Sequence, residues 1–174
     1  MKNLRRLALI GGIALSAVAF SPKAQAQPAI VDFNGTVAPT CNVDETTNGT
    51  LQQFSPDFLT TDGDNRGSII LTCNGGTTFT ISSIADNNST ISNGTYNADV
   101  DEVFVDISDE ANFPVIFARV SPSLGFSENV GEASPLQPGP LNAKKYWVSM
   151  SLIDFQDFKP GTYRVRVSVD LTPQ

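Results

Sequence analysis

The segment Tyr163-Arg-Val-Arg-Val-Ser-Val-Asp-Leu171 alternates strictly between apolar and polar side chains. Successive side chains of an extended strand point to opposite faces, so this alternation predicts a strand with one buried face. We expect the buried row to hold Tyr163, Val165, Val167, Val169 and Leu171. We expect the outward row to hold Arg164, Arg166, Ser168 and Asp170.

The same two-residue period recurs earlier in the chain. It is seen in residues 31–43, 69–73, 79–81 and 146–152, and less clear apolar runs lie at 103–107 and 114–118. Turn-forming residues separate these runs, as in Asn74-Gly75-Gly76, Asn93-Gly94 and Lys159-Pro160-Gly161. No stretch of ten or more residues after residue 26 has a convincing helical period. Short strands with frequent turns predict an all-β sandwich.

The N-terminus has the pattern of a secretory signal. Lys2, Arg5 and Arg6 precede an apolar stretch at 7–20, and Ala24-Gln25-Ala26 places small residues before the expected cleavage site. The apolar stretch is about 14 residues, shorter than the roughly 20 of a spanning helix. We therefore expect residues 1–26 to be a cleaved signal peptide and 27–174 to be a single exported domain without membrane insertion.

Residues 27–174 carry all 18 acidic residues but only 7 of the 11 basic ones, which gives a net charge of 7 − 18 = −11. Such a surface repels nucleic acid and anionic membranes, so neither is an expected partner. The negative charge fits a partner with a basic surface. The alternative is that the acidic surface faces water and binds no partner.

The chain has two cysteines, Cys41 and Cys73. Export favours a disulfide between them, closing a loop of about 33 residues. A metal site or a reactive thiol is the alternative, but a metal would need further soft or imidazole ligands and the chain has no His. Each cysteine falls on the apolar side of its predicted strand, so we expect the disulfide to be buried.

Three segments resemble the spore coat U and Csu-type pilin family of fimbrial subunits. The first is Val31-Asp-Phe-Asn-Gly-Thr-Val-Ala-Pro-Thr-Cys41-Asn-Val43, which looks like the first strand of those subunits. The second, Gly67-Ser-Ile-Ile-Leu-Thr-Cys73-Asn-Gly-Gly-Thr-Thr-Phe79, resembles their second cysteine strand and the hairpin that follows. The third, Pro160-Gly-Thr-Tyr-Arg-Val-Arg-Val-Ser-Val-Asp-Leu171, is similar to their closing strand.

The resemblance implies an immunoglobulin-like (pilin-type) β-sandwich that lacks its last strand. In that family a periplasmic chaperone lends the missing strand. An outer-membrane usher then replaces it with the N-terminal strand of a neighbouring pilin subunit, by strand addition at a sheet edge. The resemblance therefore implies a structural subunit of a surface fimbria or coat-like polymer, passing from the periplasm to the cell surface.

The segment at 27–37 is the candidate donor strand. Ala29, Val31, Phe33, Gly35 and Val37 share one face at a period of two. The alternative is that this segment is the first strand of its own sandwich, and the position of Cys41 supports that for the distal part. One arrangement accommodates both, with 29–35 donated and 36–43 kept in the home sheet.

Other functions have less support in the sequence. The chain lacks His, the commonest general base, and it lacks nucleophile and phosphate-binding motifs, so we expect no enzyme, no cofactor and no metal. Trp147 lies on the face opposite Tyr146 and could mark an exposed interface or pack under a loop. The alternative function is a self-complete adhesin-like or carbohydrate-binding module, in which the segment at 87–145 completes the sheet or carries a site.

Overall fold

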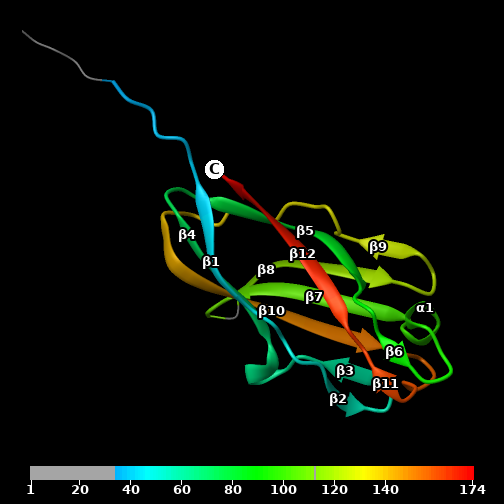
Figure 1. Cartoon of the computed structure of the whole chain (residues 1–174). Helices are drawn as coiled ribbons and strands as arrows, with labels where there is room; N and C mark the ends of the chain where they lie inside the picture. Colours follow the sequence, from blue (N-terminus) through cyan, green and yellow to red (C-terminus); the bar gives the residue numbers. More distant parts are fainter. Residues whose placement is uncertain (1–33, 112) are drawn as a thin grey trace, which may run out of the picture. The chain divides into compact units, whose positions relative to one another are not determined.

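Antiparallel strands account for most of the regular structure in the computed structural model, which describes residues 34–111 and 113–174 (Figure 1). The predicted signal peptide at 1–26 and three predicted donor residues, Ala29, Val31 and Phe33, lie outside the described residues. Residues 37–174 form one compact unit. The all-β prediction is confirmed.

The main sheet has the strand order β1-β4-β10-β7-β8-β9; β3 also pairs with β10, and β2 pairs with β3. All of its pairings are antiparallel. Its strands are β1 (Cys41–Thr47), β2 (Gln52–Ser55), β3 (Phe58–Thr60), β4 (Gly67–Cys73), β7 (Glu102–Asp109), β8 (Pro114–Ser121), β9 (Phe126–Glu128) and β10 (Leu141–Ile153).

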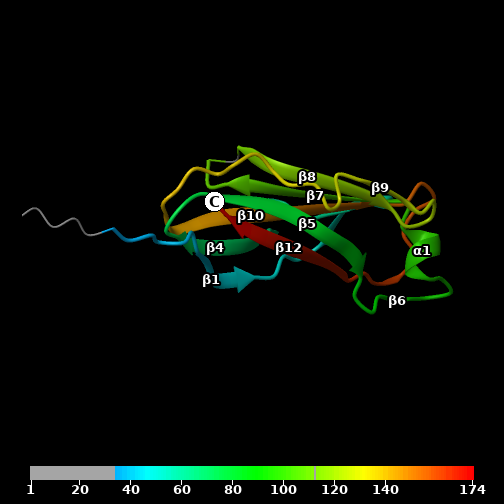
Figure 2. The same ribbon diagram turned by 90° about the horizontal axis from the view of Figure 1, so that it is seen from above.

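The second layer is a pair of long strands, β5 (Thr77–Asp86) and β12 (Val165–Pro173). The other edge of β5 is bridged by residues 131–137, where Gly131 and Ser134 donate backbone hydrogen bonds to β5. A short pair, β6 (Thr90–Ile91) with β11 (Gly161–Thr162), extends this layer. The start of β1 and the C-terminus lie at one end of the unit, and β6 lies at the other (Figure 2).

The core lies between the two layers and is built from the inward rows of the predicted strands. Phe79 of β5 contacts Tyr146 of β10 with ring centroids 4.7 Å apart, and both side chains are fully buried. Leu71, Ile81 and Leu152 are equally buried. This packing supplies most of the stabilisation, at about 1.5–3 kcal/mol for each large apolar side chain removed from water.

Helical structure is limited to two short elements among the described residues, a 3-10 turn η1 (Gly63–Asn65) and a helix α1 (Tyr96–Asp99). A turn at Asn93-Gly94 precedes α1. Asn93 has a φ of 56°, and a Cβ on Gly94 would lie 1.8 Å from the Asp99 carboxylate. Glycine is therefore required there for close approach.

The predicted strand at 31–43 is wrong for its described part before Cys41. Residues 34–40 are exposed and form no strand, and β1 runs instead from Cys41 to Thr47. Pro39 provides a reason, because proline has no N–H to donate to a sheet ladder. The expectation that 36–40 stay in the home sheet is wrong for the same reason.

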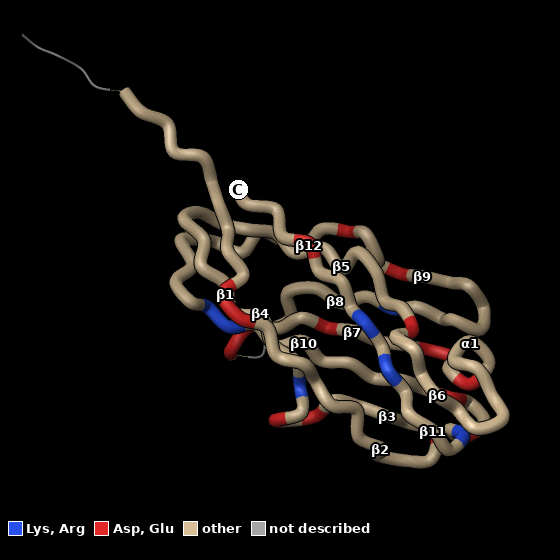
Figure 3. Tube along the Cα trace, viewed as in Figure 1, with Lys and Arg blue, Asp and Glu red and all other residues tan. Residues whose placement is uncertain are grey.

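Acidic positions are spread along the described chain, whereas basic positions are few (Figure 3). The strands predicted at 103–107 and 114–118 are confirmed as β7 and β8. The segment at 87–145 therefore adds strands to the main sheet, and its residues 131–137 cover the free edge of β5.

Candidate functional site: an open groove between two strand edges

A groove of about 580 Å³ runs between β1 and β12. Residues of β4 and β10 also line it, including Ile69, Val148 and Met150. The groove therefore reaches down to the core between the two layers, at the place where no strand of the described residues joins β1 to β12.

The β12 wall of the groove is the apolar row predicted from sequence. Val165, Val167, Val169 and Leu171 all line the groove, with Tyr163 at the same face just before the strand. These five side chains are half-buried rather than buried. Their inward direction is confirmed, but their burial is incomplete because the layer opposite them stops at β1.

Both strands that bound the groove have an unpaired edge. Within the described residues, β12 pairs only with β5, and β1 pairs only with β4. Unpaired N–H and C=O groups along a strand edge are a template for another strand. An added strand here would meet a backbone partner on each side.

The β1 wall differs from the sequence expectation of a half-buried strand. Val43 faces the groove but is 52% exposed, and the residues after it are exposed as well. The expectation of a half-buried face is therefore wrong for this part of β1, because no strand of the described residues covers that face.

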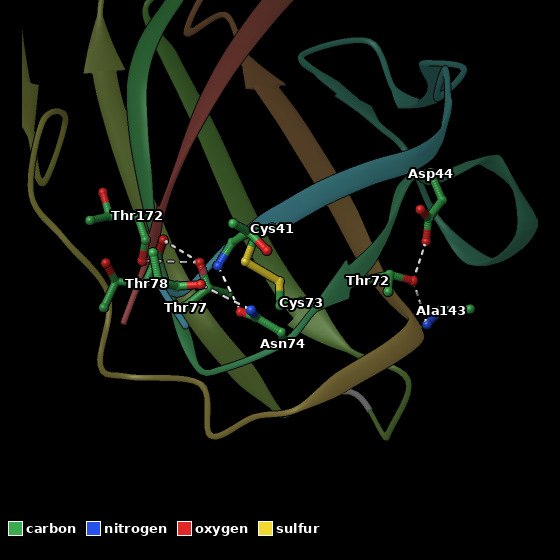
Figure 4. Close-up of a disulfide and its surroundings, with 11 residues drawn as sticks. Cys41, Asp44, Thr72, Cys73, Asn74, Thr77, Thr78, Ala143 and Thr172 are labelled. Carbon is green, nitrogen blue, oxygen red and sulfur yellow. Dashed lines mark hydrogen bonds between the residues drawn. A yellow bond between two sulfur atoms is a disulfide. The ribbon is translucent and has the colours of Figure 1, made fainter. Parts of the chain in front are cut away.

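A disulfide attaches β1 to the rest of the sheet (Figure 4). Cys41 and Cys73 are directly opposite each other in the β1–β4 register, with their Cα atoms 4.1 Å apart. The predicted disulfide is confirmed. Cys73 is buried at 2% exposure, whereas Cys41 is only half-buried, so the expectation of full burial is correct for one partner.

Hydrogen bonds from β4 extend this attachment. The Thr72 hydroxyl donates to the Asp44 carboxylate (2.6 Å) and accepts from the Ala143 N–H (3.1 Å), which links β1 to β10. The Asn74 side-chain amide bonds to both Ala38 and Thr40. The sequence marked Asn74 only as a turn residue, and its contact with 38–40 could not be seen without the register of the two strands.

The predicted donor residues are not assembled by this structure. Gly35 and Val37 are exposed, Val37 at 85%, and Val37 does not line the groove. Ala29, Val31 and Phe33 lie outside the described residues. Their role as donors stays a prediction.

Trp147 faces outward from β10, opposite Tyr146, as predicted. Its ring is contacted by two cations: the Lys145 ammonium lies 3.8 Å from the ring centroid and the Arg66 guanidinium 4.5 Å. Cation–π contacts of this kind occupy an aromatic face. They reduce the ring surface left for stacking a ligand.

Burial raises the pKa of two tyrosines near the groove and the core. Burial raises the pKa of Tyr146 to about 12, assisted by Asp109. Burial also raises the pKa of Tyr163 at the end of the groove, and the Asp99 and Asp154 carboxylates add to this effect. Among the described residues, no group of His, Cys, Asp and Glu is arranged to hold a metal ion.

No helix within the described ranges is long and apolar enough to cross a membrane.

Residues 27–105 match the family model of the Spore Coat Protein U domain. No curated protein matched the chain. The family match covers the predicted donor segment, both cysteines, β1, β4 and β5, so the resemblance to the spore coat U family that the sequence predicts is confirmed over these residues.

Proposed function

We propose that this chain is a structural subunit of a bacterial surface fimbria or coat-like polymer, assembled by donor-strand complementation. The observation that carries the proposal is the groove between β1 and β12, which is lined by core side chains and bounded by two unpaired strand edges.

The family assignment supports the general part of this proposal. Spore Coat Protein U domains are found in fimbrial and pilin-like subunits, which supports a surface-structure role. The family is a structural, pilin-type family rather than an enzyme family.

The energetics favour an added strand. The four apolar side chains of β12 are only partly buried, and completing the burial of each one contributes a fraction of the about 1.5–3 kcal/mol that full burial gives. Backbone hydrogen bonds to β1 and β12 would add to this, since the groups along both edges have no strand partner in the described chain. An empty groove leaves an apolar surface that promotes aggregation.

The donor in this proposal is the segment 29–37 of a neighbouring subunit, with Ala29, Val31, Phe33, Gly35 and Val37 facing the groove. Nine extended residues span about 30 Å, the length of a nine-residue strand such as β12. Residues 34–40 are exposed and belong to no strand, which is compatible with their donation to another molecule.

The partners in this proposal are those that the resemblance to fimbrial subunits implies, and the open groove offers them a place to bind. A periplasmic chaperone would fill the groove after export, and an outer-membrane usher would exchange the chaperone strand for the donor of the next subunit. The protein would pass through the periplasm and end in a surface fimbria.

The decisive experiment is thermal unfolding and mass measurement of residues 27–174, expressed in an oxidising periplasm, with and without a synthetic peptide of residues 27–38. We expect an unstable or self-polymerising chain that the peptide stabilises. A stable monomer that ignores the peptide would contradict the proposal and favour the self-complete adhesin-like or carbohydrate-binding module.

A variant pair tests the donor face. Phe33→Asp should abolish polymerisation, because it places a charge in an apolar groove. Asn34→Asp adds the same charge at the neighbouring, outward position and should still polymerise. Normal polymers from Phe33→Asp would exclude Phe33 as a donor residue.

A further inference from the structure

Most of the basic side chains in the described residues already have a partner. Three form ion pairs with carboxylates: Arg119 with Glu102, Lys144 with Asp109, and Lys159 with Asp99. Two more, Arg66 and Lys145, contact the Trp147 ring. Of the seven Lys and Arg in 34–111 and 113–174, only Arg164 and Arg166 form neither an ion pair nor a ring contact within those ranges.

These two arginines lie together at the open edge of the second layer. Both are exposed, and they alternate with Val165 and Val167, which face the groove. Arg164 itself lines the groove. In a chain whose residues 27–174 have a net charge of −11, two unpaired cations side by side at an unpaired strand edge are available to an incoming acidic group.

Exposed acidic side chains lie elsewhere on the two strands that bound the groove. Asp44 and Glu45 are exposed on β1, and Asp170 is exposed further along β12. The positive charge on the rim is therefore confined to the end of the groove at Arg164 and Arg166. A strand lying in the groove would meet opposite signs of charge at the two ends of β12.

The predicted donor segment carries a single charge. Asp32 is the only charged residue in 27–40, and it lies between Val31 and Phe33, two of the residues proposed to enter the groove. Because side chains alternate along a strand, Asp32 would face solvent beside the rim when its neighbours face inward.

We infer that Arg164 and Arg166 recognise the Asp32 carboxylate of a donated strand and thereby set its register. This inference rests on the proposed function. A slip of one residue is opposed by the apolar alternation itself, since it turns the apolar row outward. A slip of two residues is not, because Val165, Val167 and Val169 offer the donor nearly identical surfaces.

The charges on β12 distinguish registers of the donated strand that the three valines do not distinguish. A two-residue slip toward the other end of β12 moves Asp32 from the arginines toward Asp170. Opposite charges on neighbouring strands stabilise the pairing, and like charges destabilise it. Charge therefore helps to select among registers that the three valines alone do not distinguish.

The test measures binding of fluorescent 27–38 peptides to the mature Phe33→Asp chain, whose own segment does not donate. Relative to the natural peptide, we expect Asp32→Asn to bind roughly two- to fivefold more weakly at low salt, the range of an exposed ion pair, and Asp32→Arg more weakly still. Both differences should disappear near 1 M salt, where the screening length is about 3 Å.

A charge swap identifies the partner. The acceptor Arg164→Asp/Arg166→Asp should bind the natural peptide weakly and recover binding of the Asp32→Arg peptide. Lys145→Asp makes a similar charge change away from the groove and should bind both peptides like the unchanged acceptor. Thermal unfolding of each acceptor checks its fold, and Arg164→Gln/Arg166→Gln, which removes charge without reversing it, replaces the swap variant if that variant does not fold.

The outcomes separate the two proposals. Equal binding of the natural and Asp32→Arg peptides would overturn the role of the arginines while leaving strand donation intact. The same conclusion would follow if the Arg164→Asp/Arg166→Asp acceptor still preferred the natural peptide over the Asp32→Arg peptide. It would also follow if the Arg164→Gln/Arg166→Gln acceptor still bound the two peptides with different affinities. Failure of the natural peptide to bind any acceptor would overturn strand donation itself.

Discussion

Asn74 bonds to the main chain on both sides of Pro39. The Thr40 N–H donates to Asn74 Oδ1 (2.7 Å), and Asn74 Nδ2 donates to the Ala38 carbonyl oxygen (3.0 Å). Pro39 has no N–H, so the β1–β4 ladder does not continue past it by backbone bonds alone. The Asn74 side chain supplies the missing donor and acceptor, and it holds the chain just before β1 against β4.

Asn74→Ala removes both side-chain bonds but keeps the backbone bond from the residue 74 N–H to the Thr40 carbonyl oxygen (3.1 Å). It should therefore loosen residues 38–40 at a cost of about 1 kcal/mol in the free energy of unfolding. The specific readout is hydrogen exchange of the Thr40 amide, which should lose protection. Asn74→Asp keeps the acceptor for Thr40 and loses the donor to Ala38, so it should retain that protection. Equal exchange in the natural chain and Asn74→Ala would show that the contact does not persist in solution.

Replacing both Cys41 and Cys73 with Ser should lower the free energy of unfolding by roughly 3–4 kcal/mol, because the unfolded chain regains the freedom of its closed loop. Urea unfolding with and without reductant measures this. Reductant should destabilise the natural chain and leave the Ser variant unchanged. An unaltered unfolding midpoint in the Ser variant would mean that the disulfide does not stabilise β1 in its sheet.

Tyr146 should contribute to alkaline unfolding. Its hydroxyl is buried without a hydrogen-bond partner among the described residues, and its pKa is raised to about 12. The unfolded tyrosine ionises near pH 10 while the folded one keeps its proton. Its stability contribution is therefore complete below pH 10 and declines as pH rises toward 12, by about 1.4 kcal/mol per pH unit.

Tyr146→Phe keeps the ring packed on Phe79 and removes the ionising group. Between pH 10 and 12 its free energy of unfolding should decline less steeply than that of the natural chain. The difference in slope should be that of one proton, about 1.4 kcal/mol per pH unit. The decline should not vanish, because burial also raises the pKa of Tyr96 and Tyr163. Parallel curves for the two proteins would show that Tyr146 ionises equally in both states.

Lys159 and Asp99 should behave as a coupled pair. Asp99 is buried at 2% exposure, its Oδ2 has no hydrogen-bond partner in the described part of the chain, and its Oδ1 is bonded to the Lys159 ammonium. Lys159→Met leaves this carboxylate buried and unpaired, so we expect a loss of about 1–3 kcal/mol, less than for a fully buried pair because Lys159 is half-exposed.

The coupling is measured by a double-mutant cycle in urea. Asp99→Asn combined with Lys159→Met should cost less than the sum of the two single changes, because the double variant has no unpaired buried charge. Strict additivity would show that the two side chains do not interact in solution.

Local pattern alone was enough to predict which face of these strands points toward the core. The alternation in 69–73, 79–81 and 163–171 correctly predicted which side chains face inward, because the two-residue period is a property of every extended chain. The disulfide was predicted from two cysteines in a chain whose N-terminus has the pattern of a secretory signal. These features depend on residues close in sequence or on a count of residues.

Only the tertiary structure decided which of the inward faces are buried, because that depends on whether a neighbouring strand covers them. The same alternation that buries Phe79 leaves Val43 and Val167 at an open groove, because nothing in the described chain pairs with the outer edge of β1 or β12. The bonds of Asn74 to Ala38 and Thr40 likewise follow from the register of distant segments, as does the lack of a carboxylate partner for Arg164 within 34–111 and 113–174. An alternating sequence specifies the face that a side chain takes, whereas its burial depends on whether another strand arrives to cover that face.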